Sequence, residues 1–184
     1  MTQSIRCVLK EVRCTFPKLF QAEEFQGKTR FSVGLILQPD TPQLAKVEKA
    51  CRDAVVAAFG EAEAAKKIRQ MKQSKTTWPI RTMEDGTFMI TPKRDISKGA
   101  PVVLDGRKNQ IPEQAGLPYG GCWLNVSLDA YCYSKMGSGV TLYLNGVQLV
   151  REDAALAGAS TAASCKDDFE ELENTGSDDD DLVF

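Results

Sequence analysis

Aromatic and polar side chains alternate with small apolar ones along residues 122–133. The polar set comprises Trp123, Asn125, Ser127, Asp129, Tyr131 and Tyr133. A period of two places the two sets on opposite faces of a β-strand. Residues 140–145 repeat the pattern and add Tyr143 to the polar face, and Lys135 lies in the turn between the two stretches. Aromatic rings beside cations suit a single-stranded nucleic acid, because its bases can stack on the rings.

The predicted stacking residues are Trp123, Tyr131, Tyr133 and Tyr143. An outward aromatic face is unfavourable in water unless a partner covers it, which supports this interpretation. The alternative is that the rings pack under a loop or against another subunit. For Trp78 and Phe88, packing is the preferred interpretation.

The charge of the chain is unevenly distributed. Residues 152–184 contain eleven Asp and Glu and one Lys, a net charge of −10, whereas residues 1–151 carry a net charge of +8. A basic body predicts a polyanionic ligand. The residues predicted to contact phosphate are Arg6, Arg13, Lys18, Arg30, Lys93, Arg94, Arg107 and Lys135.

The acidic end of the chain has two interpretations. It is either a disordered tail that keeps the protein in solution or a mimic of the ligand. Asp178, Asp179, Asp180 and Asp181 form a run of negative charges, and the terminal Phe184 could enter a site built for a base. The opposite charges of body and tail favour a tail that occupies the binding face until nucleic acid displaces it and then binds partner proteins.

Enzymatic chemistry is not expected. The sequence contains no histidine, no phosphate-binding loop and no nucleophile motif. Its six cysteines form no CxxC pair, so they are interpreted as reduced core residues, and neither a metal nor a cofactor is predicted. No apolar run is long enough to span a membrane, and no signal peptide is recognisable, so a cytoplasmic protein is expected.

The elements that would position these residues are mainly strands. Alternation predicts strands over residues 5–16 and 29–37, with a slip near Lys10 that indicates a bulge. Residues 21–28 are predicted to form a polar loop between them. A helix is expected from Pro42, and a second, weaker one over residues 61–71. Short strands follow at 87–91 and 102–104, before a hairpin over 122–150 with a bulge at Asn145. Residues 1–151 are predicted to form one domain, and residues 152–184 a flexible acidic tail.

An ordered series of segments resembles a family of bacteriophage single-stranded DNA-binding proteins. The segments are CTFPKLFQ, FSVGLILQPD, PVVLDG, YGGCWLNVSLDAYCYS, GVTLYLNGVQLVRED and DDFEEL. The resemblance implies a mainly β chain with α elaboration: an OB-fold, a five-stranded Greek-key barrel, with a helical insertion. It also implies that the acidic tail ending in Phe184 recruits replication and recombination proteins.

We therefore expect sequence-nonspecific binding of single-stranded DNA during phage replication or recombination, in the cytoplasm of the host bacterium. An RNA-binding barrel and a protein-interaction scaffold are the alternatives. The sequence leaves open whether the chain forms a homo-oligomer.

Overall fold

The computed structural model describes residues 3–135 and 137–156. The tail residues Asp178–Asp181 and Phe184 therefore lie outside the described residues. The helices are α1 (Pro42–Phe59) and α2 (Glu61–Lys72), with short 3₁₀ turns at Ile96–Lys98 and Glu113–Ala115. The strands are β1 (Ile5–Phe25), β2 (Lys28–Leu37), β3 (Arg81–Thr82), β4 (Phe88–Ile90), β5 (Lys93–Asp95), β6 (Val102–Leu104), β7 (Trp123–Tyr133) and β8 (Gly139–Arg151).

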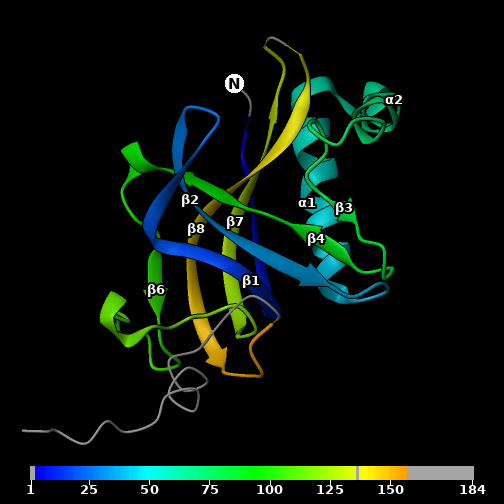
Figure 1. The fold of residues 1–184 in the computed structure, drawn as a ribbon. Helices are drawn as coiled ribbons and strands as arrows, with labels where there is room; N and C mark the ends of the chain where they lie inside the picture. The colour runs from blue at the N-terminus through cyan, green and yellow to red at the C-terminus, as the bar shows by residue number, and fades with distance from the viewer. Residues whose placement is uncertain (1–2, 136, 157–184) are drawn as a thin grey trace, which may run out of the picture.

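Five of these strands close into a barrel (Figure 1). β1 pairs antiparallel with β2 on one side and with β7 on the other. β7 pairs with β8, β8 runs parallel to β5, and β5 pairs with β2. Each of the five strands therefore has two partners within the ring, which runs β1-β2-β5-β8-β7. This confirms the predicted mainly β barrel of the OB type.

Two of the register shifts in the long strands are the bulges that the sequence indicated. The register between β1 and β7 shifts between Leu9 and Val12. Glu11 adopts a φ of 51° there, and its backbone N–H donates to Asn125 Oδ1 at 3.1 Å. The second shift leaves Asn145 of β8 without a direct partner in β7. Both irregularities lie where the alternation slips in the sequence, and they let a strand curve around a closed barrel.

The helical insertion covers one side of the barrel. Thr41 caps α1 by accepting the Leu44 N–H at 3.4 Å, and Pro42 occupies the first turn, as predicted. The helix packs against β1 and β7. Its buried residues are Leu44, Val47, Ala50, Cys51, Ala54 and Val55. In Figure 1, α2 lies beside α1.

The first strand is longer than the sequence predicted. Residues 21–28 were expected to form a polar loop, but β1 continues to Phe25 and pairs with the start of β2. The two strands are joined by Gln26 and Gly27, whose φ angles are 51° and 72°. Positive φ at both central residues is what a type I′ hairpin turn requires. Polar residues conceal this hairpin in the sequence because its end is exposed and has no apolar face to bury.

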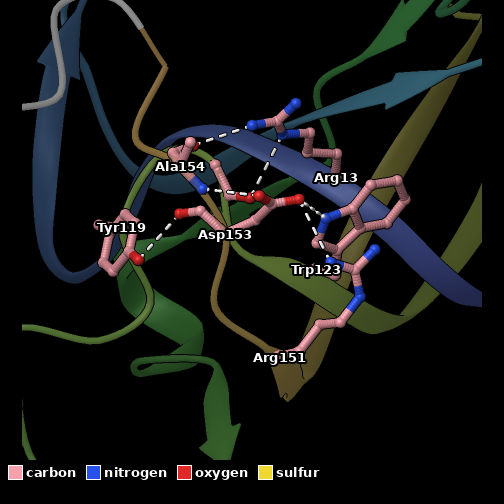
Figure 2. A network of polar contacts seen from close by, with 7 residues as sticks. Arg13, Tyr119, Trp123, Arg151, Asp153 and Ala154 are labelled. Atoms are coloured by element: carbon pink, nitrogen blue, oxygen red, sulfur yellow. Dashed lines mark hydrogen bonds and ion pairs between the residues drawn. The ribbon is translucent and has the colours of Figure 1, made fainter.

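The chain that follows β8 is fastened back onto the barrel (Figure 2). Leu156 N–H donates to the Gly120 carbonyl at 3.0 Å, and Arg13 Nη2 donates to the Ala154 carbonyl at 2.8 Å. Gly121 allows this close approach: a Cβ atom there would lie 2.4 Å from the Ala154 oxygen. The start of the acidic segment is thus held beside the first residues of β7.

Asp153 is the centre of this attachment, which we call the clasp (Arg13, Tyr119, Trp123, Arg151 and Asp153). Trp123 Nε1 donates to Asp153 Oδ2 at 2.8 Å, and Arg151 Nη1 lies 3.2 Å from the same oxygen. The Arg151 guanidinium also stacks over the Trp123 ring, with its Cζ 4.4 Å from the ring centroid. Tyr119 donates its hydroxyl to the Asp153 carbonyl at 3.0 Å. The hydrogen bond from Trp123, followed by those from Ala154 N–H and Arg151, lowers the pKa of Asp153 to about 2.

We predict that Asp153→Asn lowers the free energy of unfolding at pH 7 but not at pH 2. A carboxylate with a depressed pKa in the folded state stabilises it above the unfolded pKa of about 4 and loses this effect as the pH falls through about 2. Denaturant unfolding of both proteins between pH 7 and pH 2 measures the difference. Glu84→Gln removes an exposed carboxylate in the β3–β4 turn and is the control. If the free energy of unfolding of the wild type exceeds that of Asp153→Asn by the same amount at pH 2 as at pH 7, the Asp153 charge is not responsible.

Candidate nucleic-acid interface

A groove with a volume of about 1030 Å³ crosses the outer face of the barrel. Side chains from β2, β5, β7 and β8 line it, so its floor spans the seam where the barrel closes. The predicted contact residues that it brings together are Arg30, Lys93, Arg94, Tyr131, Tyr133 and Tyr143. Basic and aromatic residues from distant parts of the sequence therefore share one concave surface.

Strand register explains why rings and cations meet. Lys93 lies opposite Tyr143 in the parallel β5–β8 pair, and Tyr143 lies opposite Asp129 in β7. Arg30 lies opposite Asp95 in the β2–β5 pair. Neighbouring strands are about 5 Å apart, so a cation on β5 lies one strand from a ring on β8. Alternation then directs these side chains outward, because their neighbours Leu142, Leu144 and Ala130 are buried.

Tyr131 and Tyr143 form the aromatic part of the groove. Their ring centroids lie 5.9 Å apart, with the ring planes inclined by 46°. Tyr143 is 46% exposed and Tyr131 is half-buried, so at least one broad ring is open to a ligand. This geometry can accept planar groups that stack on the rings.

Tyr133 is held in place by a glycine. It lies opposite Gly139 in the β7–β8 pair, and a Cβ atom on Gly139 would lie 2.3 Å from the Tyr133 hydroxyl oxygen. The ring therefore covers the space that a side chain would occupy on β8. Packing over a glycine in this way fixes an aromatic residue at the edge of the groove.

The cations of the groove lie close enough to repel one another. Burial lowers the pKa of Lys93, and the positive charges of Arg30 and Arg81 lower it further. A bound anion would relieve this repulsion, as a phosphate does on any basic surface. Lys28 and Lys98 also line the groove, and the sequence interpretation did not include them. Their positions next to Gly27 and Gly99 are the only sequence signal for them.

Arg94 has structural hydrogen bonds of its own. Its Nε donates to the Gly99 carbonyl at 2.8 Å, and its Nη2 donates to the Lys98 carbonyl at 2.7 Å. A third, longer bond of 3.3 Å joins Nη1 to the Leu144 carbonyl. The guanidinium thereby ties the turn after β5 to β8 and orients Lys98, while its positive charge remains at the groove.

The acidic residue Asp129 is neutralised within the groove. Arg6 of β1 forms an ion pair with it and donates two hydrogen bonds to its carboxylate. The Arg6 side chain is 64% exposed and the Asp129 side chain 17%. Arg6 thus offsets a negative charge that would otherwise oppose an anionic ligand.

The remaining predicted residues do not line this groove. Trp123 and Arg13 belong to the clasp, eight or more residues from Tyr131 along β7 or its partner strand, which corresponds to roughly 25 Å. Lys18 lines a separate, smaller hollow beside Pro17, and Arg107 is exposed in the turn after β6. Lys135 is exposed in the β7–β8 turn, next to the Tyr133 end of the groove.

Other chemistry finds little support in the described residues. Within them, no group of three or more His, Cys, Asp or Glu side chains is placed to hold a metal ion, and none of their helices is long and apolar enough to cross a membrane. The described cysteines are buried thiols, and burial raises the pKa of Cys14 to about 12. Such thiols are poor nucleophiles at neutral pH.

The chain is similar to three phage proteins, one by sequence and two by fold. The p50 protein of Acyrthosiphon pisum secondary endosymbiont phage 1 is 25% identical over 171 residues, which cover 89% of this chain and 92% of that protein. The fold is similar to that of the single-stranded DNA-binding protein from bacteriophage Enc34 in complex with ssDNA, with a TM-score of 0.62 and 18% identity over 85% of this chain and 95% of that one. It is also similar to gp2.5, a single-stranded DNA-binding protein encoded by bacteriophage T7, with a TM-score of 0.55 and 19% identity over 92% and 97% of the two chains.

The sequence itself matches a family across almost its whole length. The family is described as the ssDNA-binding protein of Enterobacter phage Enc34, and the match covers residues 5–183. The ordered segments that suggested a phage family and the barrel that the chain forms are therefore consistent with one assignment. The chain belongs to the family of the ssDNA-binding protein of Enterobacter phage Enc34.

Proposed function

We propose that this protein binds single-stranded DNA without sequence preference along the groove between β2, β5, β7 and β8. The observation that carries the proposal is the juxtaposition of stacking rings and mutually repelling cations in one open groove. Membership of a ssDNA-binding family supports it. Stacking and phosphate contacts read no base edges, so they tolerate any sequence.

Each part of the groove has a role in this proposal. Bases stack on Tyr131 and Tyr143, with Tyr133 at the edge. Phosphates are held by Lys28, Arg30 and Lys93, while Arg94 and Lys98 add positive charge and Arg6 neutralises Asp129. A strand whose bases lie on these rings cannot pair with another strand, so binding would protect it and remove its secondary structure. The activity is one of binding, in replication or recombination of phage DNA in the host cytoplasm.

The proposal leaves four residues that the sequence pointed to outside the DNA path, namely Trp123, Arg13, Lys18 and Arg107. Trp123 serves the clasp, because its indole N–H is bonded to Asp153 and its ring is covered by Arg151. Arg107 is left out of the DNA path, because it lies in an exposed turn outside the groove.

Replacing Tyr143 with Ala should weaken binding to an oligo-dT strand by about 1–3 kcal/mol, because one stacking platform is lost. Fluorescence anisotropy of a labelled strand measures the change. Tyr143→Phe keeps the ring and should bind nearly as tightly as the wild type. Equal affinity of the Ala variant and the wild type would place the bases elsewhere.

Replacing Lys93 with Ala should reduce the salt dependence of binding. Each phosphate contact on a single strand contributes about 0.7 to the slope of log K against log salt concentration. The slope should therefore become shallower by about this amount, whereas Arg107→Ala should leave it unchanged. If Arg107→Ala lowers the slope and Lys93→Ala does not, the phosphate path runs along the other face.

The same titrations separate DNA from RNA and from a pure protein scaffold. Matched DNA and RNA strands test whether the protein prefers DNA. A scaffold would bind neither strand at low salt, and its exposed rings would then belong to a protein contact.

We also propose that the acidic end of the chain competes for the groove and recruits replication or recombination proteins when DNA displaces it. Its Asp178–Asp181 run and terminal Phe184 offer negative charge and one ring to a basic, ring-lined surface, and the two parts of the chain carry −10 and +8. The clasp fixes where this segment begins.

Removing residues 167–184 should tighten binding of single-stranded DNA, most strongly at low salt, because an internal competitor is lost and its attraction is electrostatic. Anisotropy titrations of the full-length and shortened protein at roughly 20 mM and roughly 300 mM salt measure the change, because the higher salt concentration shortens the Debye length and screens the attraction. A shortened protein that binds no tighter at either salt concentration would contradict the competition.

A further inference from the structure

An exposed phenylalanine lies at the end of the β1–β2 hairpin. Phe25 is 68% exposed, as is Phe16 farther back on β1. A single exposed apolar residue needs no explanation by itself, so the position of the ring decides whether it has a role.

The register of the hairpin places Phe25 on the groove side. Phe25 lies directly opposite Lys28, and Glu23 lies opposite Arg30. Residues directly opposite each other in an antiparallel pair project to the same face, with their Cβ atoms about 5 Å apart. Lys28 and Arg30 both line the groove, so the face that carries them also carries Phe25.

The turn holds the ring close to the cation. Gln26 and Gly27 both have positive φ, and this two-residue connection fixes the pairing of Phe25 with Lys28. The hairpin end therefore carries a phenylalanine and a lysine on one face at the β2 end of the groove. The same combination occurs at its floor, where Lys93 lies opposite Tyr143.

We propose that Phe25 is a further base-stacking residue, which receives a nucleobase of the strand as it enters or leaves the groove while Lys28 contacts the adjoining phosphate. This inference rests on the proposed function and extends it by one subsite. Phe25 belongs to the segment that the sequence pattern assigned to a loop, and its role follows from the strand pairing alone.

The test compares three variants at position 25 on an oligo-dT strand. Phe25→Ala should weaken binding about fivefold or more, Phe25→Leu should weaken it although the position stays apolar, and Phe25→Trp should restore it. Because stacking releases no counterions, the slope of log K against log salt concentration should stay at the wild-type value in all three. In Phe25→Trp, the emission of the new indole should also change on DNA binding.

Two controls make the result specific. Phe16→Ala removes a ring of the same exposure that lies at the register shift between Thr15 and Lys18, opposite no residue of the groove, and it should leave the affinity unchanged. A strand of the same length with abasic sugars should bind wild type and Phe25→Ala equally, because it offers no base to stack.

Each outcome bears on one proposal. Equal affinity of Phe25→Ala and wild type for oligo-dT, or an equal loss on the abasic strand, would overturn the stacking role of Phe25 while leaving the groove intact. A change in the sedimentation of the DNA-free protein on Phe25→Ala, without a change in DNA affinity, would identify the ring as a contact between protein molecules. A wild-type protein that fails to bind oligo-dT would instead refute the proposed function.

Discussion

Closure of the barrel between β5 and β8 is the contact on which the groove depends. It consists of one parallel register position, Lys93 opposite Tyr143, beside the longer antiparallel pairings of the ring. Without it, the cations of β2 and β5 and the rings of β7 and β8 would lie on the two open edges of one sheet. The two bulges make closure feasible, because they let β1 and β8 curve while their apolar faces stay inward. Arg94 supports the same seam by bonding to the Leu144 carbonyl.

Electrostatic repulsion is built into this seam. Arg30, Lys93 and Arg81 come from three different strands. Burial disfavours the charged form of Lys93, and the positive charges of Arg30 and Arg81 disfavour it further. The only acidic side chain from β7 that lines the groove is paired with Arg6. A folded protein retains such an arrangement at a cost in stability, and an anionic ligand reverses that cost. Under the proposed competition, the same cations attract the acidic end of the chain.

Residue type alone does not assign a role to an aromatic ring. Trp123 and Tyr131 share one face of β7, yet they make different contacts. The bonds of Trp123 to Asp153 and Arg151 fix the start of the acidic segment, and Tyr131 packs against Tyr143 in the groove. The eight residues of strand from Trp123 to Tyr131 separate the two environments by about 25 Å, so a shared face is not a shared site. Phe25 illustrates the converse, because it is distant from Lys93 in sequence but projects to the same side of the barrel.

The sequence by itself determined the strands with strong alternation, both bulges, the capped helix and the opposite charges of the two parts of the chain. These features are local, because period-two alternation, a helix cap and the slip in alternation at a bulge each depend only on neighbouring residues. The hairpin end of β1 was missed because its side chains are mostly polar and solvent-exposed and carry no periodic signal. Only the tertiary structure decided which cations join Tyr131 and Tyr143, that Trp123 belongs to the clasp, and that Lys28 and Lys98 border the groove. Those choices depend on strand order and register, which are set by long-range pairing and leave no local pattern in the sequence.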